Sequence, residues 1–186
     1  MQHSCHVLGL LARIDVANLP DAVVKTTTPA RHRPIATPPG RATLKLVPSV
    51  PPYRAQLATL AERAPSGERW LHELKYDGYR IGCVIEHGQV RLLTPRDGDW
   101  TEKFPEIVAA VGELRVETAL LDGEVTIVEP KGTTSLRALE SACCGGPREG
   151  LTYFVFDLID LDGESLAALP LEQRKAKCEV LLQRAG

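Results

Sequence analysis

Short apolar stretches and turn residues alternate around one lysine, Lys75, over residues 70–93. Residues 70–74 and 79–85 are mostly apolar and are separated by the turn dipeptide Asp77-Gly78, which predicts two strands on either side of Lys75. A third short apolar stretch over 89–93 follows another turn and predicts a third strand. A lysine between two strands would stand exposed at the mouth of a sheet.

Helical and strand patterns then alternate to the end of the chain. Apolar residues spaced three and four apart predict helices over 104–114, 135–143 and 171–184. Longer apolar runs over 119–128 and 151–159 predict buried strands. Strands and helices intermixed in this way, with hairpin-like connections, predict an α+β domain with a mixed or antiparallel sheet and flanking helices.

The first 52 residues differ in composition from the rest. Seven prolines and three arginines lie between Thr26 and Pro52, which is typical of an extended or disordered linker. Residues 1–25 match no pattern that we can place. We therefore expect an unassigned N-terminal segment with a proline-rich linker over 1–52 and a folded domain over 53–186, beginning with a short helical turn over 57–64.

Composition excludes several classes of protein. The chain has 186 residues, of which 44% are hydrophobic and 25% charged, enough for one domain with a real core. Its net charge of −2 gives no overall basic footprint, which argues against a self-sufficient DNA binder. The five cysteines form no C-x-x-C pair, so a reduced cytoplasmic protein is the simplest interpretation. No apolar run approaches the roughly 20 residues of a membrane span.

The candidate chemistry centres on residues 75–80, Lys-Tyr-Asp-Gly-Tyr-Arg. They fit the pattern Lys-x-Asp-Gly-x-Arg, in which a lysine can attack the α-phosphate of a nucleoside triphosphate. The attack needs a neutral amine, whereas an unperturbed lysine has a pKa near ~10.4. Arg80 could lower that pKa and also neutralise phosphate charge. Six residues alone also fit an ordinary hairpin with a surface lysine and arginine.

Further motifs follow in a fixed order over 93–101, 121–124 and 153–158. In order and spacing the series resembles the adenylation domain of ATP-dependent DNA ligases. Residues 70–80 and 168–175 resemble most the ligase module of bacterial ligase D, which acts in non-homologous end joining. The set is specific, because four separate motifs would have to arise by accident.

The resemblance implies roles for the residues around the lysine. Lys75 would form the lysyl-AMP intermediate, and Arg80 would contact the nucleotide. Glu73 and the backbone of Leu74 would read the amino edge of adenine. From the pattern alone, Glu73 would be an ordinary surface acid.

Two residues downstream complete the implied nucleotide pocket. Phe156 would stack on adenine, although its place in an apolar strand favours core packing when the pattern is read alone. Glu124 would bind a ribose hydroxyl and lie at the metal site. Asp122, two residues earlier, is expected to be structural.

The second motif departs from the family order Thr-Arg-Asn-Gly, because the chain has Thr94-Pro95-Arg96-Asp97-Gly98. Without a gap, Pro95 falls where the nucleotide-binding arginine belongs. With a one-residue shift, Arg96 takes that role. We favour Arg96, because the ungapped alignment puts Asp97 where the turn needs a glycine.

The resemblance also implies a function and its limits. It implies a partial ATP-grasp-like nucleotidyltransferase domain that uses ATP with Mg²⁺ or Mn²⁺ and acts on nicked or broken double-stranded DNA in repair and recombination. The implied partners are the end-binding protein Ku and polymerase or phosphoesterase modules, and the implied location is the bacterial cytoplasm at the nucleoid. The family's later lysine segments and OB-fold do not appear before Gly186, so we expect an incomplete enzyme that does not seal nicks alone. An RNA ligase, a capping-type guanylyltransferase and a non-catalytic nucleotide-binding module remain alternatives.

Overall fold

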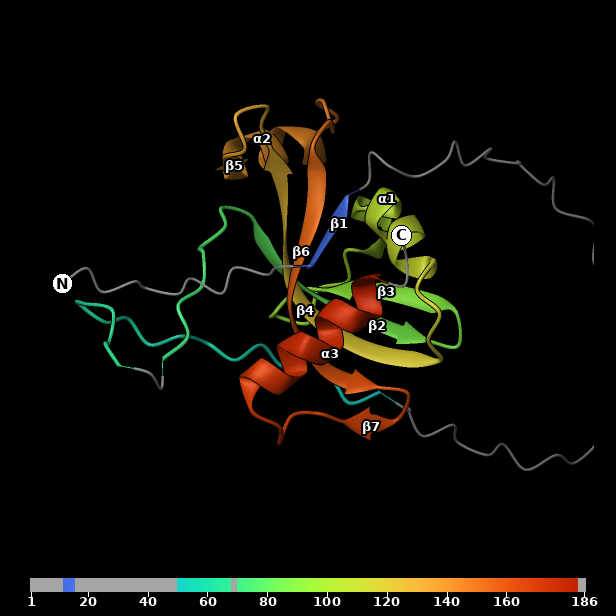
Figure 1. Cartoon of the computed structure of the whole chain (residues 1–186). Coiled ribbons are helices and arrows are strands. Elements are labelled where there is room, and N and C mark those ends of the chain that lie inside the picture. Colours follow the sequence, from blue (N-terminus) through green and yellow to red (C-terminus); the bar gives the residue numbers. More distant parts are fainter. Residues whose placement is uncertain (1–11, 16–49, 68–69, 184–186) are drawn as a thin grey trace, which may run out of the picture.

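The computed structural model describes residues 12–15, 50–67 and 70–183, and all structural statements below concern these residues. They form a seven-stranded sheet with helices packed against it (Figure 1). The strands are β1 (Ala12–Asp15), β2 (Tyr79–Glu86), β3 (Gln89–Leu93), β4 (Thr118–Val128), β5 (Thr134–Ser135), β6 (Leu151–Leu161) and β7 (Glu164–Ser165). The helices are the 3-10 helix η2 (Thr101–Lys103) and the α-helices α1 (Pro105–Gly112), α2 (Leu136–Cys143) and α3 (Leu171–Gln183).

The sheet is antiparallel at every described pairing. Its main path runs β1-β6-β4-β2-β3, while β5 pairs with β4 and β7 with β6. The two longest strands, β4 and β6, therefore lie side by side in the middle of the sheet (Figure 1). Their pairing contains register shifts at Leu120/Leu121 and Asp122/Gly123. The second of these irregularities lies next to the acidic motif of β4, and bulges of this kind re-aim side chains.

One face of the sheet carries the main core. Side chains alternate between faces along a strand, so Ile81, Cys83 and Ile85 of β2 share one face. They are fully or nearly fully buried, in one cluster with β4, β6 and the inner sides of the three α-helices. The strongly apolar β4 and β6 follow from their place in the centre of the sheet.

The opposite face is only partly covered, and it carries the polar side chains of the motifs. Its apolar part is a small cluster of Val50, Tyr53, Val84 and Leu120. The ring of Tyr53 lies flat against the backbone of Gly82, where an added Cβ would come within 2.4 Å of ring carbons. A glycine is therefore required at this position for the segment around Tyr53 to pack on the sheet.

The helices are short and begin where the sequence gives them a start. Pro105 occupies the first turn of α1, and Ser135 caps α2 by accepting a hydrogen bond from the Ala138 N–H at 3.2 Å. The longest described helix, α3, has 13 residues. Among the described residues, no helix is both long enough and apolar enough to cross a membrane.

Most predicted elements are confirmed, and two are wrong. The predicted strand over 70–74 has no strand partner and is an irregular segment, and the predicted helical turn over 57–64 is not helical. Their apolar side chains do not join the core: Leu60 is 98% exposed and Leu74 60% exposed. A few apolar residues at a suitable spacing do not make an element when no surface of the domain is available to bury them.

The division of the chain at residue 52 stays a prediction, and the described residues before it contact the sheet. Ala12–Asp15 forms β1 and pairs with β6, and Val50 is buried against the sheet. Both therefore contact the sheet that carries the motifs. A composition average over a proline-rich window cannot reveal a four-residue strand whose partner lies far along the chain. The other residues of 1–49, including most of the predicted linker, lie outside the described part.

The packing of Tyr53 on Gly82 can be tested by adding one methyl group. Gly82→Ala should destabilise the domain by about 1–3 kcal/mol, because the ring and the strand cannot separate without losing the buried contacts of Tyr53. Thermal unfolding measures the effect. Gly112→Ala is the matched control, since an added Cβ there meets nothing within 4 Å. Equal melting temperatures for Gly82→Ala and the unchanged protein would contradict the packing.

Candidate active site

The floor of the site is an ion pair between neighbouring strands, with a buried carboxylate and a partly exposed arginine. Asp122 of β4 is 3% exposed and accepts two hydrogen bonds from Arg80 of β2, Nε–Oδ1 at 3.1 Å and Nη2–Oδ2 at 2.7 Å. The Tyr53 hydroxyl donates to the same Asp122 Oδ1 at 2.8 Å. The remaining Arg80 nitrogen, Nη1, donates to the carbonyl oxygen of Gln56 at 2.7 Å. One carboxylate thus joins β2, β4 and the segment that enters the domain.

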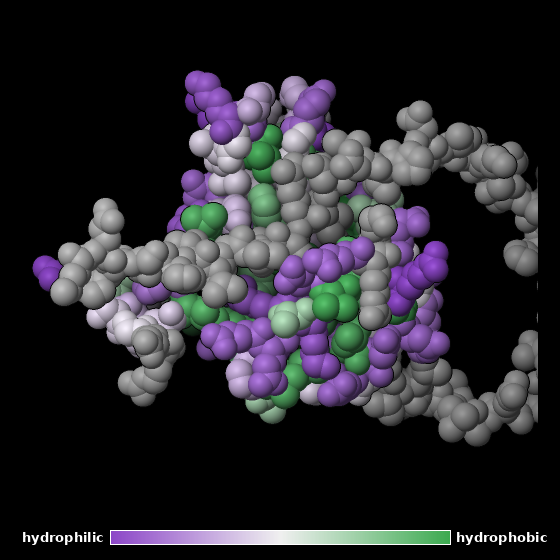
Figure 2. Space-filling model, in the orientation of Figure 1, coloured by the Kyte–Doolittle hydropathy of each residue, from purple (hydrophilic) through white to green (hydrophobic). Residues whose placement is uncertain are grey.

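A cleft of about 1060 Å³ opens above this ion pair. Six of the seven residues proposed from the sequence line it: Glu73, Leu74, Lys75, Arg80, Glu124 and Phe156. They come from the segment before β2, from β2, from β4 and from β6, which meet only in the folded chain. Figure 2 shows hydrophobic residues as separate patches among hydrophilic ones on the face in view. The cleft lining is likewise mixed, with charged groups beside apolar surface.

Residues 73–78, here called the lysine loop, carry the nucleophile candidate without belonging to a strand. The Tyr76 ring stacks on Phe154 of β6, with ring centroids 4.1 Å apart and planes 12° from parallel. Gly78 presses against β4 so closely that a Cβ would come within 2.1 Å of the Val125 carbonyl oxygen. The lysine loop is therefore held by contacts with β4 and β6. The strand pairing that we predicted for this segment is not formed.

Lys75 is exposed and paired with its neighbour. Its side chain is 86% exposed, and its Nζ lies 2.7 Å from Asp77 Oδ1. The hydrogen bond and charge of Asp77 raise the pKa of Lys75 above its usual value. Arg80, which we expected to lower the pKa of Lys75, is paired with Asp122, and the pKa of Lys75 is raised. In this state Lys75 is an ammonium ion, suited to attract a phosphate but not yet to attack one.

Glu124 lies beside the same loop in a partly buried position. Burial is the main cause that raises its pKa to about 6, and Asp122 adds to the rise. Arg80, Lys75 and a hydrogen bond from the Gly78 backbone oppose it. Glu124 pairs directly opposite Arg80 in the sheet, so its carboxyl group is held on the cleft face. A cation bound in the cleft would stabilise the ionised form of this carboxylate, which burial disfavours.

Phe156 belongs to the cleft and not to the core. It is half-buried, and it is absent from both clusters of buried apolar residues. The Arg80 guanidinium carbon lies 5.5 Å from its ring centroid. That distance is within the range of a cation–π contact. An aromatic ring backed by an arginine is a surface on which a flat base could stack.

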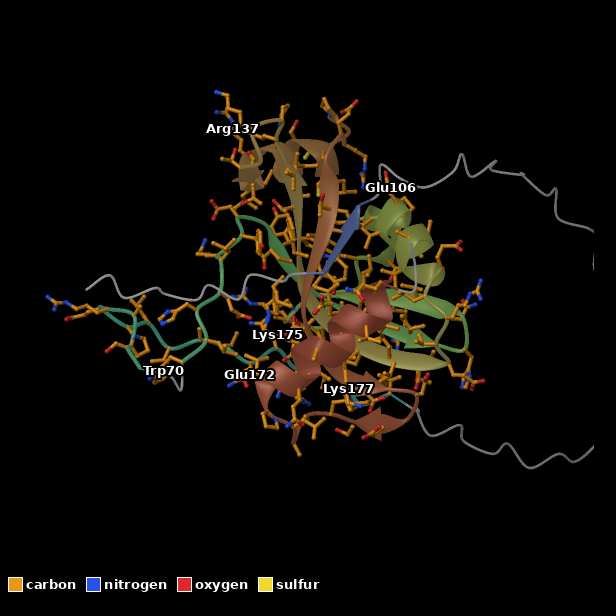
Figure 3. All side chains as sticks on the ribbon, viewed as in Figure 1. Trp70, Glu106, Arg137, Glu172, Lys175 and Lys177 are labelled. Carbon is orange, nitrogen blue, oxygen red and sulfur yellow. The ribbon has the colours of Figure 1, made fainter. Side chains whose placement is uncertain are left out.

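The structure also assigns partners that the sequence analysis did not foresee. Arg174 of α3 makes two hydrogen bonds to Asp157, at 2.8 and 2.9 Å, and fixes the start of α3 beside Phe156. Lys175 donates to the Phe156 carbonyl oxygen at 2.9 Å and forms an ion pair with Glu73. Figure 3 shows Trp70 out on the segment that projects from the sheet and Lys175 on α3 near the middle of the molecule. The resemblance over 168–175 was the available signal, but it named no contacts.

Arg96 is the predicted site residue that does not line the cleft. It lies exposed in a turn in which the Asp97 N–H donates to the Thr94 carbonyl oxygen at 3.1 Å. Asp97 itself adopts the left-handed region, with φ of 60°. Asp97 therefore occupies a conformation that favours glycine, so its presence there does not exclude the ungapped alignment. The assignment of Arg96 to the nucleotide stays a prediction.

The described residues do not supply enough ligands for a metal ion by themselves, so a bound cation would need further ligands from another molecule. They contain no group of three or more His, Cys, Asp or Glu side chains that could hold a metal ion. Of the two carboxylates on the cleft face of β4, Asp122 is occupied by Arg80 and Tyr53, which leaves Glu124. Magnesium is commonly held by one or two carboxylates together with substrate phosphates. The site therefore fits a cation that arrives with a polyphosphate.

Comparison with known proteins gives the family. The model of the ATP dependent DNA ligase domain matches residues 52–185. The chain belongs to this family. The match begins beside Tyr53 and takes in the whole cleft, from the lysine loop to α3.

Individual relatives agree with the family match. The multifunctional non-homologous end joining protein LigD of Pseudomonas aeruginosa is 38% identical over 180 residues, covering 93% of this chain and 21% of that protein. The SPbeta prophage-derived DNA ligase-like protein LigB of Bacillus subtilis is 34% identical over 110 residues, covering 58% of this chain and 39% of that protein. The crystal structure of the ligase domain of M. tuberculosis LigD matches with a TM-score of 0.50 and 28% identity, covering 59% of this chain and 36% of that one. The chain thus spans about a fifth to two fifths of these relatives.

The raised pKa of Glu124 predicts a pH-dependent gain of stability in Glu124→Gln. The folded-state pKa of about 6 exceeds the usual 4.5, so ionisation of Glu124 costs folding energy once the pH rises through this window. The difference corresponds to about 2 kcal/mol, and screening of a partly exposed carboxyl reduces it to about 1 kcal/mol. Glu124→Gln should melt higher than the unchanged protein at pH 7.5 and equally at pH 4.

A matched control separates this effect from general charge removal. Glu113→Gln replaces an exposed glutamate outside the cleft and should leave the melting temperature close to that of the unchanged protein at both pH values. If Glu124→Gln is no more stable than the unchanged protein at pH 7.5, the carboxyl is not desolvated as described.

Proposed function

We propose that this protein is an ATP-dependent nucleotidyltransferase of the DNA ligase type that carries AMP on Lys75. The observation that supports the proposal is the meeting of Lys75, Arg80, Glu124 and Phe156 around one cleft in a chain of the DNA ligase family. Three of these side chains have direct roles in the proposal, and Arg80 supports the ring of Phe156. The ring stacks on the base, the carboxylate binds the ribose or the cation, and the lysine faces the phosphates.

The proposed reaction is a displacement at the α-phosphate of ATP. Nζ of Lys75 bonds to the α-phosphorus, the bond from that phosphorus to the bridging oxygen breaks, and pyrophosphate leaves with the electron pair. The ammonium ion must first lose a proton to solvent water, so its pair with Asp77 at 2.7 Å has to open. The nitrogen loses a second proton to water once its bond to phosphorus has formed. A phosphate chain entering the cleft would compete with Asp77 for the lysine. Catalysis of this kind depends on positioning and on neutralising charge.

A divalent cation, Mg²⁺ or Mn²⁺, would be held by Glu124 together with the phosphates. It would neutralise charge on the triphosphate and on the leaving pyrophosphate. Arg80 would support the base-stacking ring from below while two of its N–H groups stay available, since Asp122 and Gln56 take three of the five. Glu73 and the Leu74 backbone would read the adenine edge, with Glu73 oriented by Lys175.

The relatives support a proposal for the wider role. The P. aeruginosa relative is named as a non-homologous end joining protein. We therefore propose that the AMP carried on Lys75 serves strand joining at nicked or broken double-stranded DNA, in repair and recombination. The end-binding protein Ku and polymerase or phosphoesterase modules are the proposed partners, at the nucleoid of a bacterial cytoplasm.

Incubation with α-labelled ATP and Mg²⁺ should place one AMP on Lys75. Mass spectrometry of proteolytic peptides locates the adduct, which should be released by acid and reversed by pyrophosphate. Lys75→Ala should abolish it, whereas Lys131→Ala, at an exposed lysine outside the cleft, should not affect it. Label on another lysine would contradict the proposal.

The same assay separates the alternatives. A capping-type enzyme would take label from GTP in place of ATP, and transfer of the AMP to nicked RNA in place of nicked DNA would indicate an RNA ligase. Binding of ATP with no adduct under any divalent cation would indicate a non-catalytic nucleotide-binding module.

Phe156→Ala should weaken ATP binding more than it weakens folding. Loss of a stacked ring costs about 1–3 kcal/mol of binding energy, which is roughly a 5- to 150-fold loss of affinity. Truncation of a core phenylalanine would instead cost roughly 3–5 kcal/mol of stability. Calorimetric titration with ATP and thermal unfolding measure the two effects. A large fall in melting temperature with unchanged ATP affinity would contradict this role and show that Phe156 is a core residue.

A further inference from the structure

The lysine loop is held by a residue outside every motif that the sequence analysis singled out. Thr134, in the short strand β5, accepts a hydrogen bond from the Asp77 backbone N–H to its Oγ1 at 3.0 Å. Thr126 of β4 donates from its Oγ1 to the Asp77 carbonyl oxygen at 2.6 Å. The peptide groups on both sides of Asp77 are therefore bonded to threonine hydroxyls of the β4–β5 pair.

These bonds act two residues from Lys75, at the point where the loop turns into β2. The Asp77 backbone precedes Gly78, which already lies against the Val125 carbonyl oxygen and cannot move closer to β4. On the other side, the Tyr76 ring is stacked on Phe154. The position of Lys75 relative to β4 thus depends on Asp77, because the lysine side chain itself is 86% exposed and unsupported by packing.

The two threonines differ in what else they support. Thr126 is fully buried, so its loss would disturb the core as well as the loop. Thr134 is half-buried and reaches the loop from the β4–β5 hairpin. Its hydroxyl is the described acceptor for the Asp77 N–H, so removing it removes an anchor of the loop at little cost to the core.

We propose that Thr134 is a positioning residue for the nucleophile, which holds Lys75 at the cleft through the Asp77 backbone N–H. This inference rests on the proposed function, because it assigns to Thr134 a part in presenting Lys75 to the nucleotide. Thr134 does not line the cleft, so it acts through the loop alone. It therefore affects the rate of lysine attack and not the binding of ATP.

The experiment compares Thr134→Val, Thr134→Ser and Thr133→Val in this chain. Valine keeps the shape of threonine and removes the acceptor, whereas serine keeps the hydroxyl. Thr133 is the matched control, because it is the preceding residue, is exposed and bonds Glu129 at 3.2 Å, away from the loop. Thermal unfolding first establishes that all three variants are folded.

Two readouts follow. Single-turnover formation of the AMP adduct, measured over a range of ATP concentrations, separates the maximal rate from the apparent affinity for ATP. Thr134→Val should lower the maximal rate about three- to tenfold, as expected for one lost hydrogen bond, with the affinity unchanged. Amide hydrogen exchange by NMR should show faster exchange at Asp77 in the same variant. Thr134→Ser should restore both values, and Thr133→Val should leave both unaltered.

The outcomes distinguish this inference from the proposed function. Absence of an adduct in the unchanged protein overturns the proposed function, while the Asp77 exchange rate still decides whether Thr134 anchors the loop. Unaltered exchange at Asp77 in Thr134→Val overturns the anchor. Faster exchange with an unaltered maximal rate, or a loss confined to ATP affinity, overturns the positioning role.

Discussion

The ion pair between Arg80 and Asp122 is the interaction on which the cleft depends. Its carboxylate is buried, and three donors from two elements converge on it. A buried charge is tolerated only when its partners are present and well placed, so β2, β4 and the segment carrying Tyr53 are fixed relative to one another. The ring of Phe156 lies over this pair. The ring that we propose as the stacking surface for the base therefore lies on the same interaction that links β2 to β4.

The rest of the cleft is built from charges that are not fully compensated. Lys75 is paired with an exposed neighbour, Asp77, and Glu124 is a partly buried carboxyl whose pKa is raised to about 6. Both charges would be better compensated with a phosphate chain and a cation between them than without. Incompletely compensated charges with shifted pKa values are typical of sites that bind a charged ligand. These charges lie on the partly covered face of the sheet, opposite the main core, so their incomplete compensation does not disrupt the core.

Much of the fold could be predicted because the pattern of each element is local. The alternation over Tyr79–Glu86, the apolar runs of β4 and β6 and the helical spacing of α1–α3 each reflect burial of one face. The predictions failed over 57–64 and 70–74, where apolar residues are exposed or line the cleft. There the pattern was that of an element, but no partner strand or core surface lay within reach. Strand β1 was missed for the converse reason, since its pairing with β6 is supplied from far along the chain.

By itself the sequence determined the family, the nucleophile candidate and six of the residues that line the cleft, because motif spacing is a property of the chain. Only the tertiary structure decided how those residues are held. It placed Asp122 under Arg80, separated Phe156 from the core and left Arg96 outside the cleft. It also showed that, among the described residues, the loop of Lys75 is hydrogen-bonded to threonine hydroxyls and is not paired as a strand. These are contacts between residues far apart in the chain, and neither spacing nor periodicity specifies which side chains meet once the strands have paired.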